Sequence, residues 1–459
     1  MGKLMAAGAL LAMIAAPVAA NAQTIDPWAG RTHVDWSRDA VIYQINTRQF
    51  TAEGTFAAAE AELPRLAEMG VDILWLMPIH PIGTVERKGS LGSPYSVLDY
   101  KGVNPEFGDL DDFKNFVDAA HAQGMKVILD WVANHTAWDH PWVEEHPEWY
   151  QRTDDGGLIS PFGWTDIVVL DYTQQGVHDA MIDALSYWVR EADVDGYRAD
   201  VAGFLPKPFW TRASAELDAI KPVWMLAEYE DRDLHEQFDA TYFWEWEKHL
   251  QKLGRGEETA DTIWGLYEDQ GVEWPSGAQR MIFTSTHDEN AWAGPARERL
   301  GPALENAIAL TFLAKGIPLI YNGQEAGLNK RLEFFERDPI VWQDHPHDTL
   351  FRDLIALRTQ YTSLHNAPWG APMTRVGNSD EERVFSFVRA NEADAVMVLQ
   401  NYSAEAVTVT LSDFAEAGTW IEHYDDTPEA LRPAPVSMGE GKELGLSPWS
   451  TRIFSRLDR

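Results

Sequence analysis

Residues 196–200 read Gly-Tyr-Arg-Ala-Asp, a short and mostly apolar segment that ends in a carboxylate. Two later segments end in the same way, Met-Leu-Ala-Glu at 225–228 and Phe-Thr-Ser-Thr-His-Asp at 283–288. An earlier segment, Asp-Trp-Val-Ala-Asn-His at 130–135, carries polar residues at both of its ends. Acidic side chains at the carboxyl ends of several barrel strands are typical of catalysis rather than of stability. The pattern therefore predicts a barrel whose functional groups gather at one end.

Around these segments, from about residue 40 to residue 364, β-prone runs alternate with helical stretches. Such alternation predicts a parallel sheet whose strands are joined by crossover helices. The predicted strands are 41–45, 72–77, 126–131, 196–201, 223–227, 240–243, 281–284 and 318–321. The predicted helices are 56–69, 110–123, 178–190, 209–220, a short one near Leu234, 259–269, 301–314 and 349–364. Eight strand–helix units predict a (β/α)8 TIM barrel of the α/β class.

The predicted domain organisation follows from where this alternation stops. The barrel takes up residues 23–135 and 167–369, and a small loop subdomain, 136–166, follows the third strand. A loop this long inside a compact domain usually has a function, so we expect it to lie over the barrel mouth. Residues 370–459 hold short β-prone runs with turn residues and no helix between them. This last region is predicted to be a C-terminal antiparallel β-sandwich.

Residues 1–22 have the features of a signal peptide. Lys3 supplies the positive start, residues 4–14 the apolar run, and Ala20-Asn21-Ala22 a small-residue cleavage site. The apolar run is short for a helix that spans a bilayer, which favours cleavage over an uncleaved anchor. We therefore expect export to the periplasm or the medium, with no membrane anchor in the mature form. A monomer is the default expectation.

The chain of 459 residues carries 72 acidic and 37 basic residues, for a formal net charge of −35. This charge repels nucleic acid and anionic membrane surfaces, and it favours a neutral substrate over a phosphorylated one. The acid excess fits either simple solubility or salty surroundings, and the sequence leaves both open. Cysteine is absent from the sequence, which excludes disulfides, thiolate catalysis and Cys-ligated zinc or iron.

Asp200 and Glu228 are the candidate reacting pair for cleavage of an acetal bond between sugars. Retaining glycoside hydrolysis uses a carboxylate nucleophile and a protonated carboxyl group that lie roughly 5–5.5 Å apart. Arg198 precedes Asp200 by two residues, so both side chains share one face of a strand. The guanidinium is expected to lower the pKa of Asp200 and to keep this nucleophile ionised. The alternative is a structural Arg–Asp pair.

Glu228 is the candidate general acid/base because it follows the apolar run 223–227, and poor hydration raises a carboxyl pKa. Taken alone, a glutamate in this position is as well explained by a solvated loop. Its place at the end of the strand after that of Asp200 favours the catalytic interpretation. Asp288, which follows His287, is the candidate third carboxylate.

Two further side chains are candidates for binding a sugar. His135 follows the third predicted strand and could donate a hydrogen bond to a sugar hydroxyl. Tyr95 could stack against a sugar ring, although a lone tyrosine also fits a core or surface position. Asp130, at the base of the segment that carries His135, is expected to orient Arg198 or the neighbouring loop.

Taken together, these segments resemble the α-amylase family, glycoside hydrolase family 13, in their order and spacing. The matching segments are 130–135, 196–200, Glu228, 283–288, the Tyr95 and Asp99 pair, 170–172 and 320–325. The resemblance covers about residues 38–365 well and the remainder loosely. It implies a (β/α)8 barrel that acts on α-linked glucosides by double displacement, with retention of the anomeric configuration.

The resemblance also implies a role for each matched residue. The family's nucleophile falls on Asp200, its acid/base on Glu228 and its transition-state stabiliser on Asp288. The residues that bind sugar hydroxyls fall on Tyr95, His135, Arg198 and His287. The chemistry implied in this way requires no cofactor.

Two departures from the family pattern affect the expected binding sites. Many members carry a Lys-His pair shortly after the nucleophile, which helps bind the leaving sugar, whereas this chain has Ala202-Gly203-Phe204. Phe204 is therefore a candidate platform for that sugar. Asn134 matches a position that often helps hold a structural Ca²⁺, and calcium stays open. The acids that would complete such a site are Asp154, Asp155 and Asp166.

The first functional hypothesis is a hydrolase of α-1,4-glucosidic bonds in starch fragments or maltooligosaccharides. The alternative is a transglycosylase or isomerase with the same covalent intermediate, which differs in what accepts the glucosyl group. A third hypothesis, a sugar-binding protein without catalysis, is disfavoured because all three acids are present. The sequence leaves the choice between endo and exo cleavage open.

Overall fold

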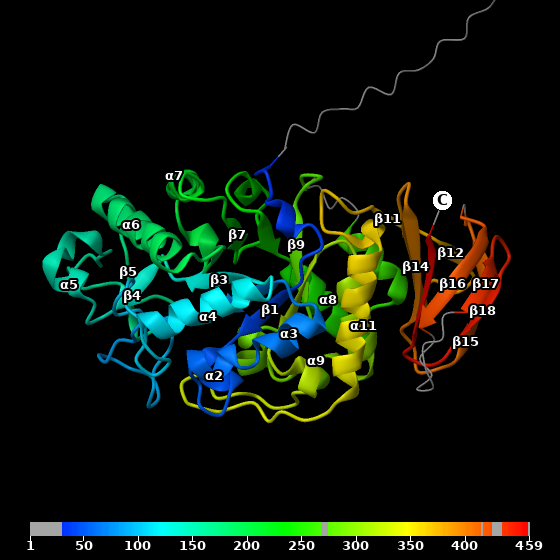
Figure 1. Cartoon of the computed structure of the whole chain (residues 1–459), viewed down its shortest axis with the longest axis horizontal. Helices are drawn as coiled ribbons and strands as arrows, with labels where there is room; N and C mark the ends of the chain where they lie inside the picture. The colour runs from blue at the N-terminus through cyan, green and yellow to red at the C-terminus, as the bar shows by residue number, and fades with distance from the viewer. Residues whose placement is uncertain (1–29, 268–273, 415, 425–433, 458–459) are drawn as a thin grey trace, which may run out of the picture.

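Eight parallel strands close into a barrel in the order β1-β10-β9-β8-β7-β6-β3-β2, as predicted (Figure 1). The computed structural model describes residues 30–267, 274–414, 416–424 and 434–457, so the predicted signal peptide lies outside the described residues. The barrel strands are β1 Ile42–Ile45, β2 Ile73–Leu76, β3 Lys126–Trp131, β6 Gly196–Ala199, β7 Trp224–Ala227, β8 Ala240–Tyr242, β9 Gln279–Phe283 and β10 Ile317–Tyr321. Each predicted strand corresponds to one of these within two residues at either end.

The helices cover the outside of the barrel and bury their apolar faces against the strands. They are α1 Thr47–Phe50, α2 Phe56–Glu60, α3 Leu63–Met69, α4 Leu110–Ala122, α6 Gln175–Ala192, α7 Lys207–Asp218, α8 Trp244–Gly254, α9 Ala296–Leu300, α10 Leu304–Leu313 and α11 Pro346–Gln360. The single helix predicted at 56–69 is two helices, α2 and α3. The break is consistent with Pro64, which lies in the first turn of α3 and has no backbone N–H to continue a longer helix.

One predicted helix is wrong. The segment predicted as a helix at 259–269 forms a 3₁₀ helix over Ala260–Leu266, and its last two residues lie outside the described part. The α-helix between β8 and β9 is instead α8, which buries Trp246, Leu250 and Leu253. The aromatic residues at the start of α8 have a high intrinsic preference for strands. Packing of the helix against the barrel outweighs that preference.

The interior of the barrel changes from apolar to polar along the strands. Its apolar part includes Ile42, Ile128 and Leu226, all fully buried. Gly196 lies among them because a Cβ atom there would approach the carbonyl oxygen of Trp224 to 1.9 Å. Towards the carboxyl ends of the strands, the inward-facing residues are charged. Examples are Asp130 on β3 and Arg198 on β6, which lie opposite each other in the strand register.

The chain between β3 and the next barrel strand leaves the barrel and returns. It contains a two-stranded antiparallel sheet, β4 His135–Ala137 with β5 Ile167–Val169, and a short helix, α5 Pro141–Glu145. In Figure 1 this excursion lies at the end of the molecule opposite to the C-terminal strands. The residues just before β5, Trp164 and Asp166, line a pocket at the barrel mouth.

After α11 the chain forms two antiparallel sheets that share one apolar core, which confirms the predicted C-terminal β-sandwich. A six-stranded sheet runs β11-β13-β14-β19-β16-β17 and a three-stranded sheet runs β12-β15-β18. The strands are β11 Met373–Arg375, β12 Gly377–Asn378, β13 Val384–Ala390, β14 Asp394–Asn401, β15 Val407–Ser412, β16 Gly418–Tyr424, β17 Ala434–Met438, β18 Glu443–Leu446 and β19 Thr451–Leu457. None of the helices that the structure describes has the length and apolar character needed to cross a bilayer.

Arg389 on β13 connects the sandwich to the barrel. Its buried guanidinium donates to the carbonyl oxygens of Ala314 at 2.9 Å, Leu364 at 3.2 Å and His365 at 2.8 Å. A further donation, from Nε to the carbonyl oxygen of Ala371, measures 2.9 Å. These carbonyl groups belong to residues near the end of α10 and after α11. The Arg389 guanidinium therefore satisfies backbone acceptors on both sides of the junction.

Replacing Arg389 with alanine is expected to lower the free energy of unfolding by about 3 kcal/mol, because several buried carbonyls lose their donor. Urea denaturation followed by circular dichroism measures the change. The control is Arg383→Ala, an exposed arginine paired with Asp380, for which we expect a much smaller change. Equal losses in the two variants would contradict this account of the junction.

Candidate active site

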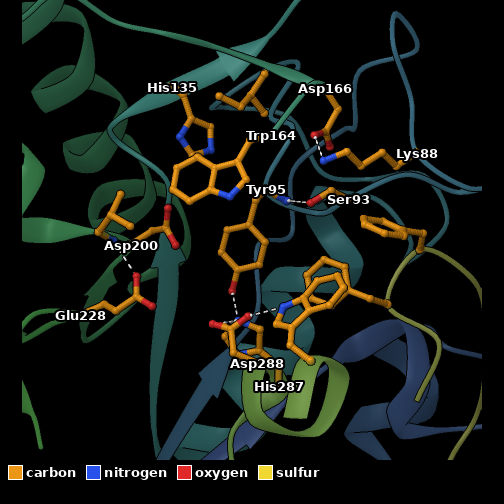
Figure 2. A pocket seen from close by; sticks show the side chains of 15 residues that line it. Lys88, Ser93, Tyr95, His135, Trp164, Asp166, Asp200, Glu228, His287 and Asp288 are labelled. Atoms are coloured by element: carbon orange, nitrogen blue, oxygen red, sulfur yellow. Dashed lines mark hydrogen bonds and ion pairs between the residues drawn. The ribbon is translucent and has the colours of Figure 1, made fainter. Parts of the chain in front are cut away.

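A pocket of about 320 Å³ opens at the carboxyl ends of the barrel strands. Six of the residues predicted for the site line it, and Figure 2 shows their side chains converging from different strands and loops. They are Tyr95, His135, Asp200, Glu228, His287 and Asp288. Asp200 and Glu228 lie side by side on one wall, and Asp288 and His287 lie together beneath Tyr95 (Figure 2). The structure thus brings together acids that are far apart in the sequence.

Arg198 lies at the centre of this arrangement, with a side chain that is 0% exposed. Its Nη1 atom lies 2.7 Å from Asp130 Oδ1 and 2.9 Å from Asp200 Oδ1. Its Nη2 atom lies 2.9 Å from Glu228 Oε1. Because Asp200 and Glu228 contact the two ends of one planar guanidinium, they are close enough for the roughly 5–5.5 Å separation of a retaining pair.

The pKa of Asp200 differs from the sequence-based expectation, which was that Arg198 lowers it. Burial raises the pKa of Asp200 to about 7, and the opposing effect of Arg198 is smaller. Burial raises the pKa of Glu228 further, to about 8, with repulsion from Asp200 and Asp288 adding to it. The expectation was wrong because it left out burial, which outweighs the effect of Arg198, and because Arg198 is shared with Asp130 and Glu228.

Glu228 also accepts a hydrogen bond from the backbone N–H of Val201, the residue after Asp200, at 2.7 Å. Val201 has φ of +38°, a left-handed conformation that is rare for a β-branched residue. Strain of this kind persists where the surrounding structure holds it, and it is concentrated at functional sites. Here the left-handed conformation of Val201 directs its backbone N–H towards Glu228, and Asp200 is the residue directly before it.

His287 is neutral and its protonation can be assigned from its neighbours. Burial lowers the pKa of His287 to about 4. The side-chain oxygen of Gln44 accepts the His287 backbone N–H at 3.1 Å, so the Gln44 amide nitrogen is turned towards Nδ1, 2.6 Å away. Nδ1 therefore accepts and Nε2 carries the hydrogen, which it directs to the Tyr95 hydroxyl at 2.7 Å.

Asp130 holds both Arg198 and Tyr95 in place. Its Oδ2 atom accepts hydrogen bonds from the Tyr95 hydroxyl at 2.9 Å and from the Trp75 indole at 3.1 Å. Its other oxygen accepts from Arg198. With its hydroxyl bound in this way, Tyr95 stacks its ring on His287 at 5.5 Å between centroids. The residue at the base of the early segment thus orients the guanidinium.

Asp288 begins a π-helical turn, Glu289–Ala293, whose Trp292 donates its indole N–H to Asp288 Oδ1 at 3.0 Å. Such turns are rare and occur frequently at functional sites. The Trp292 ring lies 5.1 Å from Phe334, which comes from the loop after β10. These aromatic side chains form a wall of the pocket beside Asp288. Sequence reasoning did not name Trp292 or Phe334, although the place of Trp292 four residues after Asp288 was a usable signal.

Asn134, Asp155 and Asp166, named above as candidate calcium ligands, each lie beside another partner. Asp166 is buried and paired with Lys88 Nζ at 2.9 Å, and the Asn134 amide lies 3.1 Å from His135 Nδ1. Asp155 lies on an exposed turn with Thr153. Among the residues that the structure describes, no three His, Asp or Glu side chains are grouped so that they could hold a metal ion. Lys88 provides the positive charge beside Asp166.

Phe204 lies on the rim of the pocket rather than in its lining. It follows Asp200 by four residues on a short 3₁₀ helix, Ala202–Phe204. Its ring contacts Phe162 from the excursion and Tyr229, the residue after Glu228, at 5.9 and 6.3 Å between centroids. Phe162, like Lys88 and Phe334, was not identified from the sequence because its proximity to the site depends on how distant loops fold.

Comparisons with known proteins identify relatives of this chain. The family model for the α-amylase catalytic domain matches residues 35–156. An α-amylase of Haloarcula japonica is 30% identical over 402 residues, which cover 82% of this chain and 57% of that protein. The crystal structure of a noncanonic maltogenic α-amylase of Thermotoga neapolitana has a TM-score of 0.83 at 30% identity, over 92% of this chain and 99% of that one.

A third relative is an α-1,4-glucan:maltose-1-phosphate maltosyltransferase of Mycobacterium tuberculosis. It is 38% identical over 189 residues, which cover 37% of this chain and 27% of that protein. The chain therefore spans little more than half of the Haloarcula relative and about a quarter of the maltosyltransferase, whereas it matches the Thermotoga structure over nearly its whole length.

The raised pKa of Glu228 predicts that this residue costs stability at high pH. In the unfolded chain a glutamate has a pKa of about 4.3, so between that value and about 8 the folded state keeps a proton that the unfolded state has lost. The contribution of Glu228 to the free energy of unfolding must then fall as pH rises through this window. Relative to wild type, Glu228→Gln is therefore expected to be more stable at pH 8 than at pH 4, by at least the roughly 1.4 kcal/mol that one unit of pKa shift represents.

Urea denaturation at the two pH values measures this difference. Glu216→Gln, on an exposed pair with Arg212, serves as the control and is expected to show no such pH dependence. An identical effect of Glu228→Gln at pH 4 and pH 8 would refute the raised pKa.

The Lys88–Asp166 pair predicts that the excursion does not need calcium. Dialysis against EDTA is expected to leave the midpoint of thermal unfolding unchanged. Lys88→Ala should lower stability by about 1–2 kcal/mol, because it strands a buried carboxylate. Lys101→Ala, on an exposed pair with Asp183, is the matched control. A lower midpoint after EDTA treatment, restored by added Ca²⁺, would overturn the interpretation.

Proposed function

The chain belongs to the α-amylase family, glycoside hydrolase family 13, and on this premise we propose that it hydrolyses α-1,4-glucosidic bonds with retention of configuration. The proposed substrates are starch fragments or maltooligosaccharides. The observation that carries the proposal is the pair Asp200 and Glu228, held at the two ends of the Arg198 guanidinium inside one pocket. This is the constellation that double displacement requires.

In the first step, Asp200 attacks the anomeric carbon and Glu228 gives its proton to the leaving oxygen. The order of the two pKa values supports this assignment. Burial raises the pKa of both carboxyl groups, and Glu228 is raised further by repulsion from Asp200 and Asp288, which favours a proton on Glu228 while Arg198 favours the charged form of Asp200. Arg198 contacts Asp200 and steadies the charge that the nucleophile carries before attack.

In the second step, Glu228 takes a proton from water, and the water oxygen attacks the anomeric carbon of the glucosyl ester on Asp200. The ester bond breaks and its electron pair returns to the Asp200 carboxylate. Asp288 lies across the pocket from Asp200 and Glu228. It is proposed to bind hydroxyl groups of the glucosyl ring as positive charge develops at the anomeric carbon. His135, kept neutral by burial, can supply a donor from Nε2 without adding charge, whereas the one N–H of His287 is directed to Tyr95.

The charge of the pocket supports a neutral sugar as substrate. Asp200, Glu228, Asp288 and Asp166 line the pocket, Arg198 contacts the first two, and Lys88 is paired with Asp166. A phosphorylated or acidic sugar would therefore meet negative charge at Asp288 that no cation offsets. Neutral hydroxyls can instead exchange hydrogen bonds with the carboxylates and His135.

A second candidate is transfer of the glucosyl group to another sugar. Transfer shares the first step with hydrolysis. The similarity to a maltosyltransferase over 189 residues supports this second candidate. A sugar-binding protein without catalysis is disfavoured, because Asp200, Glu228 and Asp288 all reach the pocket.

Hydrolysis of maltoheptaose, followed by proton NMR, tests the proposal. Wild-type protein is expected to release products in the α-configuration before they mutarotate. Asp200→Asn should lower kcat by about 1,000-fold or more, because the covalent step is lost, while maltoheptaose still binds. Asp179→Asn, on an exposed pair with Arg212, is the control and should keep full activity. Unchanged turnover in Asp200→Asn, or an initial β-product, would refute the mechanism.

A further inference from the structure

Three loops from different parts of the chain meet on the side of the pocket that faces away from Glu228. In Figure 2, Lys88 and Asp166, which come from two of these loops, lie across the pocket from Glu228. The contacts between the loops decide whether a bound sugar chain can continue past this side. The loops are residues 84–92 after β2, residues 160–166 before β5, and residues 333–337 after β10.

Lys88 joins the loop after β2 to the loop before β5. Its Nζ atom lies 2.9 Å from Asp166 Oδ1 and donates to the carbonyl oxygen of Gly163 at 3.3 Å. Asp166 is 3% exposed, and its own carbonyl oxygen accepts the Ser96 hydroxyl at 2.8 Å, so the partner of Lys88 is fixed in place. An ammonium group has three N–H donors, so Lys88 can keep both contacts and still donate to a hydroxyl group in the pocket that it lines.

The loop after β10 closes the other half of this side. Ser90 donates its backbone N–H to Glu336 Oε1 at 2.7 Å. Leu91 donates its backbone N–H to the Phe335 carbonyl oxygen at 3.2 Å. Gly89 has φ of +63°, and a Cβ atom there would lie 2.5 Å from the Phe335 Cβ atom. The two backbones are therefore in direct contact, and a sugar ring cannot pass between these loops.

Aromatic side chains continue this side of the pocket towards Tyr95. The Phe334 ring stacks on Tyr95 at 6.2 Å between centroids. Trp292 lies 5.1 Å from Phe334 and 6.0 Å from Phe335, and all four side chains line the pocket. We define the end wall of the pocket as the surface made by Lys88, Asp166, Phe334 and Phe335.

The reacting carboxylates fix the direction in which a sugar chain lies in the pocket. Asp200 attacks the anomeric carbon and Glu228 protonates the oxygen of the leaving sugar, so the leaving part of the chain lies on the Glu228 side. That side is open, because Phe204 on its rim is 48% exposed. In a pyranose ring, C4 lies directly across from the anomeric carbon. The 4-hydroxyl group, through which an α-1,4 chain continues to its non-reducing end, therefore points towards the end wall.

From this geometry we infer that the enzyme is exo-acting, and that it removes a short saccharide of one fixed length, glucose or maltose, from the non-reducing end of a maltooligosaccharide. This inference rests on the proposed function and adds which bond of the chain is cut. The pocket of about 320 Å³ is at the small end of the roughly 300–1,000 Å³ of small-molecule sites, which fits a chain end rather than a chain that runs through. Lys88 and Asp166 are the polar groups of the end wall, and they can exchange hydrogen bonds with hydroxyl groups of the terminal unit.

The experiment compares two forms of maltoheptaose, both labelled with 2-aminopyridine at the reducing end. The blocked form carries a 4,6-O-benzylidene group on its non-reducing unit, and the open form does not. Chromatography should show that full-length wild-type protein first converts the open form to a single labelled product, shorter by the released saccharide. The benzylidene group should lower kcat/KM by about 100-fold or more, because the end wall leaves no room for it.

Variants of the end wall test whether its residues impose this limit. Lys88→Ala and Phe335→Ala remove side chains from two different loops, and each should raise the ratio of kcat/KM for the blocked form to that for the open form about tenfold. This ratio does not depend on how much of a variant is folded, because both substrates report on the same active molecules. Lys101→Ala, on an exposed pair with Asp183, is the control and should leave the ratio unchanged.

Two results would overturn the inference while leaving the proposed function intact. One is wild-type protein that cuts the blocked form as fast as the open form, with several labelled products from the start. The other is a ratio that stays the same in Lys88→Ala and Phe335→Ala, since the end wall would then impose no limit. If wild-type protein cuts neither form, or if cutting persists in Asp200→Asn, the proposed function fails and the inference fails with it.

Discussion

The buried guanidinium of Arg198 is the group around which the rest of the site is organised. It contacts Asp130, Asp200 and Glu228 at 2.7–2.9 Å, and its side chain has no exposure to solvent. A cation in this position would be very costly without partners, and three buried carboxylates would repel one another without it. Each side of the cluster is therefore stable only in the presence of the other, which fixes the relative positions of β3, β6 and β7 at their carboxyl ends.

Sharing one cation among several acids has an electrostatic consequence. Arg198 cannot fully offset the burial of each carboxylate, so the pKa values of Asp200 and Glu228 both lie well above those of exposed acids. The shared arrangement costs stability near neutral pH, because buried carboxyl groups keep protons that the unfolded chain has lost, and such a cost at a candidate active site is a common relation between activity and stability.

The sequence predicted those parts of the fold and the site that depend on local order along the chain. The alternation of strands and helices located all eight barrel strands, and the segments that end in Asp200, Glu228 and Asp288 named acids that share one pocket. Two kinds of error have physical causes. Trp244 and Trp246 favour a strand locally, whereas tertiary packing makes α8. The pKa of Asp200 depends on burial and on Asp130, neither of which is visible in the spacing of Arg198 and Asp200.

The pocket residues that the sequence did not predict come from loops. The charged groups and the aromatic surfaces of the site therefore come from different parts of the fold. The charged groups stand on or directly after barrel strands, where the backbone is rigid and the Arg198 cluster holds them. The aromatic surfaces come from loops: Trp292 and Phe334 beside Asp288, and Phe162 and Phe204 beside Glu228. A change in a loop residue can alter which sugar is held on either side without disturbing the carboxylates. The barrel therefore fixes the positions of the charged groups, whereas the loops determine the aromatic surfaces beside them.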